Sequence, residues 1–174
     1  MPDTTLSQAL KEAYAAAPGN VVAYHTLEIY HPSFTHPIRV VRDFVDLEAT
    51  LESTAPRNAS QAVTFVGFAF DIVPPEVSTT GVPSCQVTID NVSRDIVANL
   101  ELAISSNQAI TIIYRLFLSS DLTAPQNNPP MTLTVIAMTA DVFKVTATAT
   151  FGDLVNKKFP SQQYTVETFP GLVP

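Results

Sequence analysis

The chain has 174 residues, of which 46% are hydrophobic and only 14% are charged, with a net charge of −7 and a pI near 4.7. The length predicts one domain, and the acidic balance disfavours a nucleic-acid-binding protein, which needs basic groups to neutralise phosphates. No apolar run approaches the roughly 18 residues of a membrane span. The N-terminus lacks the basic start and apolar run of a secretory signal, so we expect a soluble protein made in the cytoplasm.

The first predicted element is a helix from Thr5 to Ala17, where apolar residues recur at helical spacing. Thr5 and Gln8 have the spacing of a capping box. The dipeptide Pro18-Gly19 ends the helix.

After this helix the hydrophobic period changes to two, which is typical of β-strands. Strands are predicted over residues 21–31, 37–44, 61–73, 85–89, 109–118, 131–140 and 142–151. The polar, irregular segment 47–60 is interpreted as a loop, and a second short helix is predicted over 93–104. These roughly seven strands and two helices show no regular strand–helix alternation. They predict a mostly-β fold with minor α content, either a β-sandwich or a partly open barrel.

We expect residues 1–151 to form this single mostly-β domain. Residues 152–174 differ in composition, since they combine prolines and glycines with Phe159, Tyr164 and Phe169. This segment is too apolar for a disordered terminus. It is therefore predicted to be an extended C-terminal arm that packs on its own subunit or on a neighbouring one.

The sequence offers no convergent set of catalytic or metal-binding groups. His31 and His36 precede prolines in one loop, and a metal site there would add a carboxylate such as Asp43, but the spacing matches no metal motif. Both histidines are interpreted as solvated imidazoles at turns. Cys85, the only cysteine, is interpreted as a core or interface residue. Nucleophile-elbow and phosphate-loop motifs are also absent, so we expect neither enzyme activity nor a cofactor.

The stretch CQVTIDNVSRDIV, residues 85–97, joins a predicted strand to the second predicted helix. Its spacing is not that of a calcium loop. Asp and Asn favour turns, and an acidic residue in a first helical turn is favoured by the helix dipole. We interpret the junction as a strand-to-helix corner. The other interpretation is a subunit contact through Asp90, Asn91, Arg94 and Asp95.

Three stretches together resemble a known family. They are HPIRVVRD near the start, FDIVPPE followed by CQVTIDNVSRDIV in the middle, and FGDLVNKKFPSQQYTVETFPGLV at the end. They resemble small minor tail or tail-tip proteins of long-tailed bacteriophages, a family catalogued largely as a domain of unknown function. The resemblance runs from about Leu6 to Val173 and extends to the N-terminal part of lambda-type minor tail protein L. The C-terminal cysteine cluster of L-type proteins, which binds iron and sulfur, has no counterpart in a chain with one cysteine.

The resemblance implies a tail-tube-like β-fold and a structural role in a ring at the tail tip, between the tube or tape measure and the central hub or fibre. The implied partners are copies of the same chain, as a trimer or hexamer, and other tail proteins such as tube, tape measure and hub. Its implied location is the virion tail, assembled in the cytoplasm of the host bacterium. No membrane or specific nucleic-acid binding is implied, although DNA would pass through the assembled channel.

A β-sandwich module that binds a receptor or a glycan is the alternative. Its sugar platform would consist of the aromatic residues Tyr24, Tyr30, Phe34 and Phe44. Trp, the residue most expected for stacking on sugars, is absent from the sequence.

Overall fold

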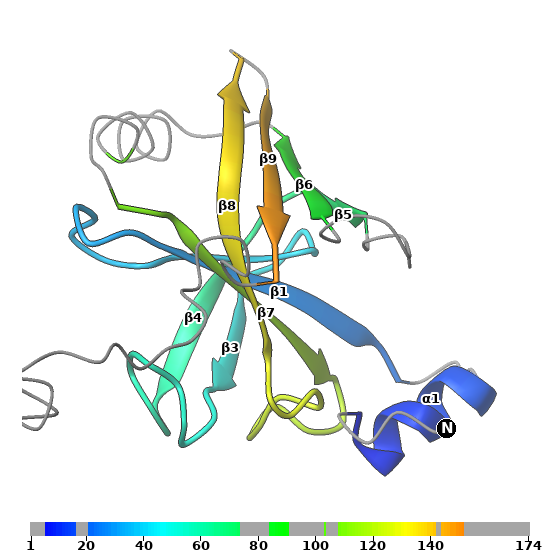
Figure 1. Ribbon diagram of the computed structural model, residues 1–174. Helices are drawn as coiled ribbons and strands as arrows, with labels where there is room; N and C mark the ends of the chain where they lie inside the picture. The colour runs from blue at the N-terminus through cyan, green and yellow to red at the C-terminus, as the bar shows by residue number, and fades with distance from the viewer. Residues whose placement is uncertain are drawn as a thin grey trace, which may run out of the picture.

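The computed structural model describes residues 6–16, 21–73, 84–90, 103, 108–141 and 144–151. Within them the chain is mostly β, which confirms the predicted fold class (Figure 1). The described elements are α1 (Gln8–Ala16), β1 (Ala23–Tyr30), β2 (Ile38–Val41), β3 (Leu47–Thr50), β4 (Ala62–Gly67), β5 (Phe70–Val73), β6 (Ser84–Asp90), β7 (Thr111–Leu118), β8 (Met131–Ala140) and β9 (Lys144–Thr150).

The described strands form one nine-stranded open sheet in the order β3-β4-β2-β1-β7-β8-β9-β6-β5. Neighbouring strands are antiparallel except β2 and β4, which are parallel. The strands therefore make a single sheet rather than two packed sheets, and the partly open barrel is nearer to the structure than the sandwich. The strand number exceeds the predicted seven because one predicted strand is divided and one predicted loop is a strand.

The divided strand connects the two ends of the sheet. The sequence predicts one strand region over 61–73, but the chain bends at Phe68 and Ala69, so that β4 pairs with β2 and β5 pairs with β6. Two backbone hydrogen bonds fix the bend, from Phe68 N–H to the Val41 carbonyl and from Asp90 N–H to the Ala69 carbonyl, both 2.9 Å. The segment from β4 to β5 thus belongs to both halves of the sheet and makes the sheet curve.

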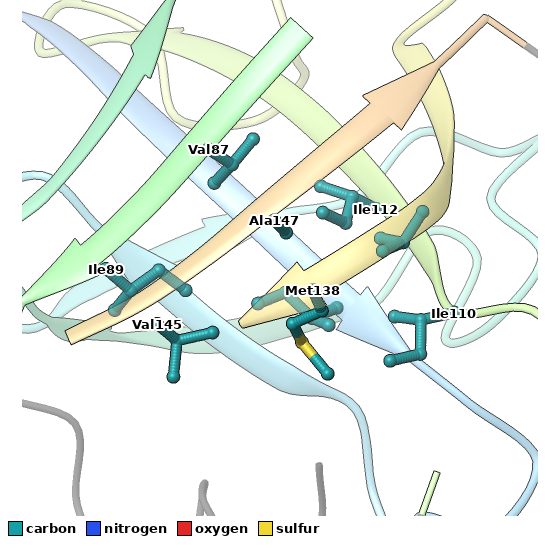
Figure 2. Close-up of a pocket in the computed structure, with 9 residues that line it drawn as sticks. Val87, Ile89, Ile110, Ile112, Met138, Val145 and Ala147 are labelled. Carbon is teal, nitrogen blue, oxygen red and sulfur yellow. The ribbon is translucent and has the colours of Figure 1, made fainter. Parts of the chain in front are cut away.

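The main hydrophobic core lies inside this curved sheet. β8 and β9 cross the direction of β1 in Figure 1, and apolar side chains of β1, β6, β7, β8 and β9 meet between them. A cavity of about 20 Å³ remains there (Figure 2). It is lined by Ile29, Val87, Ile89, Ile110, Ile112, Val135, Met138, Val145 and Ala147. Such a small, wholly apolar space offers water and polar ligands no partner, so it is a packing gap and not a binding site.

β7 is buried on both faces, as its sequence predicts. Ile112 faces the main core, whereas Phe117 faces a second core formed with β3 and β4. The rings of Phe117 and Phe65 pack there with centroids 6.0 Å apart. Since alternate residues of a strand point to opposite faces, a continuous apolar run marks a strand covered on both sides.

β3 is the strand that the sequence interpretation missed, because residues 47–60 are predicted to be a loop. Leu47 and Ala49 are buried in the second core, and Glu48 between them is exposed. Four residues pair with β4. So short an alternation is below the length at which period two can be recognised reliably, and only the pairing with β4 identifies the strand.

α1 confirms the predicted first helix, but its N-cap is Ser7 rather than Thr5. Ser7 Oγ accepts a hydrogen bond from Leu10 N–H at 3.1 Å and donates to Gln126 Oε1 at 2.6 Å. Leu10 is fully buried against Leu116 and Leu118 of β7. Ser7 therefore both caps the helix and fixes it to the loop before β8.

The second predicted helix lies outside the described residues except for Ala103, which is helical and buried. The C-terminal arm, residues 152–174, also lies outside them. Residues 142 and 143 of the turn predicted near Asp141 lie outside the described residues, and on either side of them Asp141 N–H donates to the Lys144 carbonyl at 2.8 Å.

Replacing Ser7 with alanine should lower the free energy of unfolding by about 1–2 kcal/mol, because Leu10 N–H and Gln126 lose a partner. Gln8→Ala, which removes only an exposed contact with Glu12, is the control and should change stability far less. Urea denaturation of both variants measures the difference. Equal effects would show that Ser7 is not the cap.

Candidate functional site

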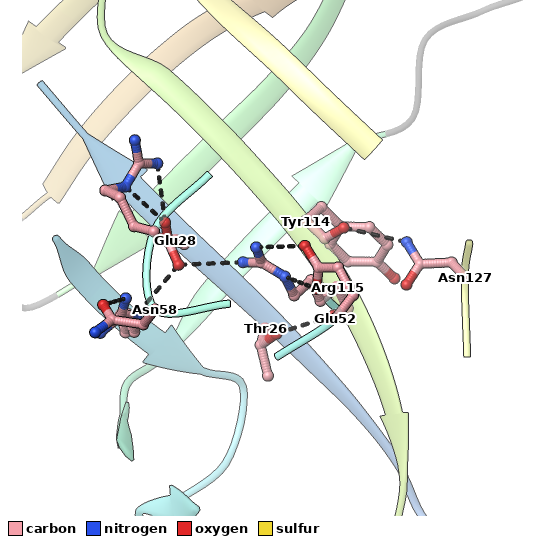
Figure 3. A network of polar contacts seen from close by, with 9 residues as sticks. Thr26, Glu28, Glu52, Asn58, Tyr114, Arg115 and Asn127 are labelled. Atoms are coloured by element: carbon pink, nitrogen blue, oxygen red, sulfur yellow. Dashed lines mark hydrogen bonds and ion pairs between the residues drawn. The ribbon is translucent and has the colours of Figure 1, made fainter. Parts of the chain in front are cut away.

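Five charged side chains form a buried network between the sheet and the loop that follows β3 (Figure 3). Glu28 on β1 and Arg115 on β7 have no exposed side-chain surface. Glu28 accepts hydrogen bonds from Arg39 at 3.1 Å, Arg57 at 2.9 Å and Arg115 at 3.2 Å. Arg115 also donates to both carboxylate oxygens of Glu52, each at 2.8 Å.

The network depends on residues that the fold brings together from separate parts of the chain. Glu28 and Arg39 are direct partners in the pairing of β1 with β2. Arg57 comes from the loop after β3, where its guanidinium also stacks on the Tyr30 ring at 3.7 Å. Asn58, in the left-handed region with φ 52°, accepts a hydrogen bond from Arg39 at 2.8 Å.

This network is a structural element and not a catalytic centre. No buried side-chain nitrogen or oxygen of the described residues lacks a hydrogen-bond partner. Each carboxylate is occupied by guanidinium groups, which are permanently charged and cannot exchange protons at neutral pH. Acid–base catalysis needs a group that can exchange a proton with a substrate, whereas both carboxylates of the network are engaged by arginine side chains.

A second polar pair, His25 and Tyr114, lies on the other face of β1 and β7. His25 Nδ1 and the Tyr114 hydroxyl are 2.7 Å apart. Burial raises the pKa of Tyr114 to about 12, so the phenol stays protonated and donates to Nδ1. Burial, assisted by the charge of Arg42, lowers the pKa of His25 and favours the neutral imidazole that accepts this bond.

The loop between β2 and β3 presents two apolar side chains to solvent. The exposed fractions of Phe44 and Val45 are 103% and 71%. Asp43 Oδ1 accepts from Phe44 N–H at 2.6 Å, and Asp46 Oδ1 accepts from Gly67 N–H at 2.9 Å. Asp43 therefore fixes the loop backbone locally, and Asp46 holds the loop against the end of β4.

Gly67 permits this close approach of the loop. A Cβ at this position would lie 3.0 Å from both the Asp43 carbonyl oxygen and the Phe44 carbonyl carbon, so no larger residue fits without displacing the backbone. The backbone of the loop thus packs directly on Gly67, while the Phe44 side chain points into solvent.

Beside this loop lies an open hollow of about 850 Å³, at the bend between β4 and β5. Its described lining combines aromatic and charged residues: Arg42, Asp43, Phe44, Gly67, Phe68, Ala69, Phe70, Asp71 and Asp90. Arg42 and Asp71 form an exposed ion pair at 3.5 Å. Three carboxylates against one guanidinium make the described lining acidic. We take the hollow and the loop from Arg42 to Asp46 as the candidate site, and call them the acidic hollow and the Phe44 loop.

Comparison with known proteins places the chain in a family. Residues 9–164 match the family described as Domain of unknown function (DUF1833), which is well over half of the sequence. The chain belongs to this family. No curated protein matches the chain. The family's description assigns no activity, so the acidic hollow has to be interpreted from its own chemistry.

Of the predicted interface residues, only Asp90 is described, and it lies in the acidic hollow of this family member. Asn91, Arg94, Asp95, Phe159, Tyr164 and Phe169 lie outside the described residues. Asp90 ends β6 and pairs across the sheet with Lys144. The sequence analysis named Asp43 and Phe44 for other roles, a metal site and a sugar platform, and did not group them with Asp90. Only the structure shows that Phe44 is fully exposed and that the three residues line one hollow.

The metal and nucleophile alternatives find no support in the described part of the chain. His31 is buried rather than solvated: its Nδ1 accepts from Ser33 N–H at 3.0 Å, and its Nε2 lies 3.2 Å from the Gln108 carbonyl, to which it donates. His36 is exposed, and no group of three potential metal ligands occurs among the described residues. Cys85 is buried in the main core, as predicted, and burial raises the pKa of its thiol. No described helix is long and apolar enough to cross a membrane.

Replacing Arg115 with methionine should lower the free energy of unfolding by about 3–5 kcal/mol, because Glu28 and Glu52 lose a buried partner. Arg42→Met is the matched control, since it breaks an exposed ion pair, and should cost less than about 1 kcal/mol. Guanidinium denaturation at constant ionic strength compares the two. Similar losses would contradict a fold that depends on the network.

His25 should make stability depend on pH. Its folded pKa lies below the ordinary 6.5, so the unfolded chain takes up a proton first as the pH falls. The contribution is therefore complete above about pH 6.5 and is lost as the pH falls below it towards the folded pKa. His25→Gln, which still offers an acceptor to Tyr114, should flatten this dependence between pH 7.5 and 5, measured by urea denaturation. His36→Gln is the control and should keep the wild-type dependence.

Proposed function

We propose that the protein is a structural subunit of a bacteriophage tail, part of a ring at the tail tip between the tube or tape measure and the central hub or fibre. The proposal joins the resemblance of three sequence stretches to tail-tip proteins with the surface chemistry of the described fold. Its function would be adhesion and shape rather than catalysis.

The observation that carries the proposal is the full exposure of Phe44. A fully exposed aromatic side chain, on a loop packed closely against Gly67, is typical of a contact that is buried in an assembly. Preorganisation matters because a loop that is already ordered loses little conformational entropy on binding. The neighbouring Val45 enlarges the apolar contact.

The sheet edges support the same interpretation. Among the described strands, β3 and β5 each have a single neighbour and form the edges of the sheet. Val73 on β5 is an exposed apolar residue at such an edge. Strand edges favour association with other chains, and a closed ring would cover them.

The receptor- or glycan-binding alternative is less favoured because its aromatic platform is not assembled. Phe34 is buried in the main core, Tyr24 packs against the second core, and Tyr30 lies beneath Arg57. Only Phe44 of the four is exposed to a ligand. A lone aromatic side chain offers one stacking surface, whereas a protein contact can use it as a central anchor.

The proposed partners are copies of the same chain, as a trimer or hexamer, with tube, tape-measure and hub proteins as neighbours. The proposed location is the virion tail, after assembly in the bacterial cytoplasm. The net charge of −7 would help DNA to pass a ring without adhering to it, if the acidic groups line the channel.

The test uses purified particles of the phage that encodes the chain. Mass spectrometry should detect the chain in the particles, and an electron-microscopy map should place it as a ring at the tail tip. Phe44→Ser in the phage genome should reduce infectious particles strongly while the melting temperature of the isolated protein stays unchanged. Ile136→Ser, at another exposed apolar side chain, is the control. Absence of the chain from the particles, together with glycan binding by the isolated protein, would overturn the proposal in favour of the binding module.

A further inference from the structure

We infer that the acidic hollow and the Phe44 loop receive the C-terminal arm of a second copy of this chain, through Lys157, Lys158 and Phe159. The inference deepens the proposed assembly role and rests on it, because copies must meet for an arm to cross between them. The arm is residues 152–174, outside the described part of the chain. The arguments are charge complementarity, matching apolar groups and chain length.

The described lining of the hollow is net negative, and the arm carries positive charge. Asp43, Asp71 and Asp90 line the hollow, with Arg42 as the only cation of its described lining. In the whole sequence, Lys157 and Lys158 are the one pair of adjacent basic residues. Three of the other cations, Arg39, Arg57 and Arg115, are already held by Glu28 and Glu52. The arm is therefore the most concentrated source of positive charge that the chain can offer.

The apolar groups also correspond. Phe159 directly follows the two lysines and precedes Pro160. The hollow presents the exposed Phe44 at its edge and the partly buried Phe68 in its lining, whereas Phe70 faces the main core. Aromatic side chains pack favourably on one another, and proline restricts the backbone of the segment to be bound, which lowers the entropy lost on docking.

Chain length favours an arm from a second copy over the chain's own arm. β9 pairs with β6 so that Lys144 lies beside Asp90 and Thr150 beside Ser84. Thr150, at the end of β9, is six residues from Lys144, the residue beside the hollow. Six residues of a strand span roughly 20 Å. Lys157 is six residues beyond Phe151, which spans roughly 20 Å only when fully extended. The chain's own arm would therefore have to be almost fully extended to bring Lys157 to the hollow, whereas an arm from a second copy is under no such limit.

Disulfide trapping tests the contact on the full-length protein. Phe44→Cys and Phe159→Cys are combined in one chain, and half of the protein is labelled with ¹⁵N before mild oxidation. We expect a disulfide between positions 44 and 159 of different copies, identified by mass spectrometry as a mixed labelled and unlabelled peptide. Ile136→Cys with Phe159→Cys is the control and should give no such product. Cys85 is buried and stays in place.

Three other results would overturn the inference. A 44–159 disulfide within one copy would place the arm on its own subunit. A 44–44 disulfide would show that the loop meets itself. The absence of any disulfide at protein concentrations where the chain self-associates, or a chain that remains monomeric, would show that the arm does not bind there.

Charge reversal gives an independent measurement. Asp71→Lys with Asp90→Lys, and separately Lys157→Glu with Lys158→Glu, should each weaken self-association about tenfold or more in sedimentation velocity. An equimolar mixture of the two variants should restore association, because each then offers a complementary partner. Failure of the mixture to recover would contradict the ion contacts. Both tests use the purified chain alone, so a chain that cross-links as expected but is missing from phage particles would refute only the tail assignment.

Discussion

The rest of the structure depends on the ion pairs between the buried carboxylate of Glu28 and three arginine side chains. An isolated charge without solvent costs several kcal/mol, so the fold is stable only if cations are delivered to it. Arg115 and Arg57 lie 87 and 29 residues away in sequence. β2, β7 and the loop after β3 must therefore reach their places together, which fixes the register at the centre of the sheet. Glu52 adds a second negative charge to the network and accepts hydrogen bonds from Arg115 through both carboxylate oxygens.

From this centre the same constraint extends to the surface. Arg39 lies on β2, and β2 leads directly into the Phe44 loop. The loop is pressed against Gly67, which begins the bend that carries the chain from β4 to β5. Backbone hydrogen bonds at Val41 and Ala69 then connect the bend to β2 and to β6. The Phe44 loop is thus joined directly to the central strands of the sheet, which makes Phe44 suitable as an anchor for a partner.

Membership of the family described as Domain of unknown function (DUF1833) leaves function to be argued from chemistry. The described part of the chain satisfies its buried polar side chains internally. Its exposed features include the Phe44 loop, the acidic hollow and the sheet edges. These features suit recognition of another protein chain more than conversion of a small molecule. The proposed tail-tip role and the proposed arm contact both develop this one property.

Local patterns in the sequence predict most of the strands, whereas the strand pairings depend on contacts between distant residues. Period-two runs predicted most strands, including Met131–Ala140 with both limits correct, because alternation is a property of neighbouring residues. It could not identify the short strand at Leu47, the bend at Phe68, the burial of His31 or the charge network. Each of these depends on partners distant in the chain, and a sequence pattern carries no information about which distant groups meet. Asp90, at a junction the sequence had marked, became part of a site only because β6 ends beside the Phe44 loop.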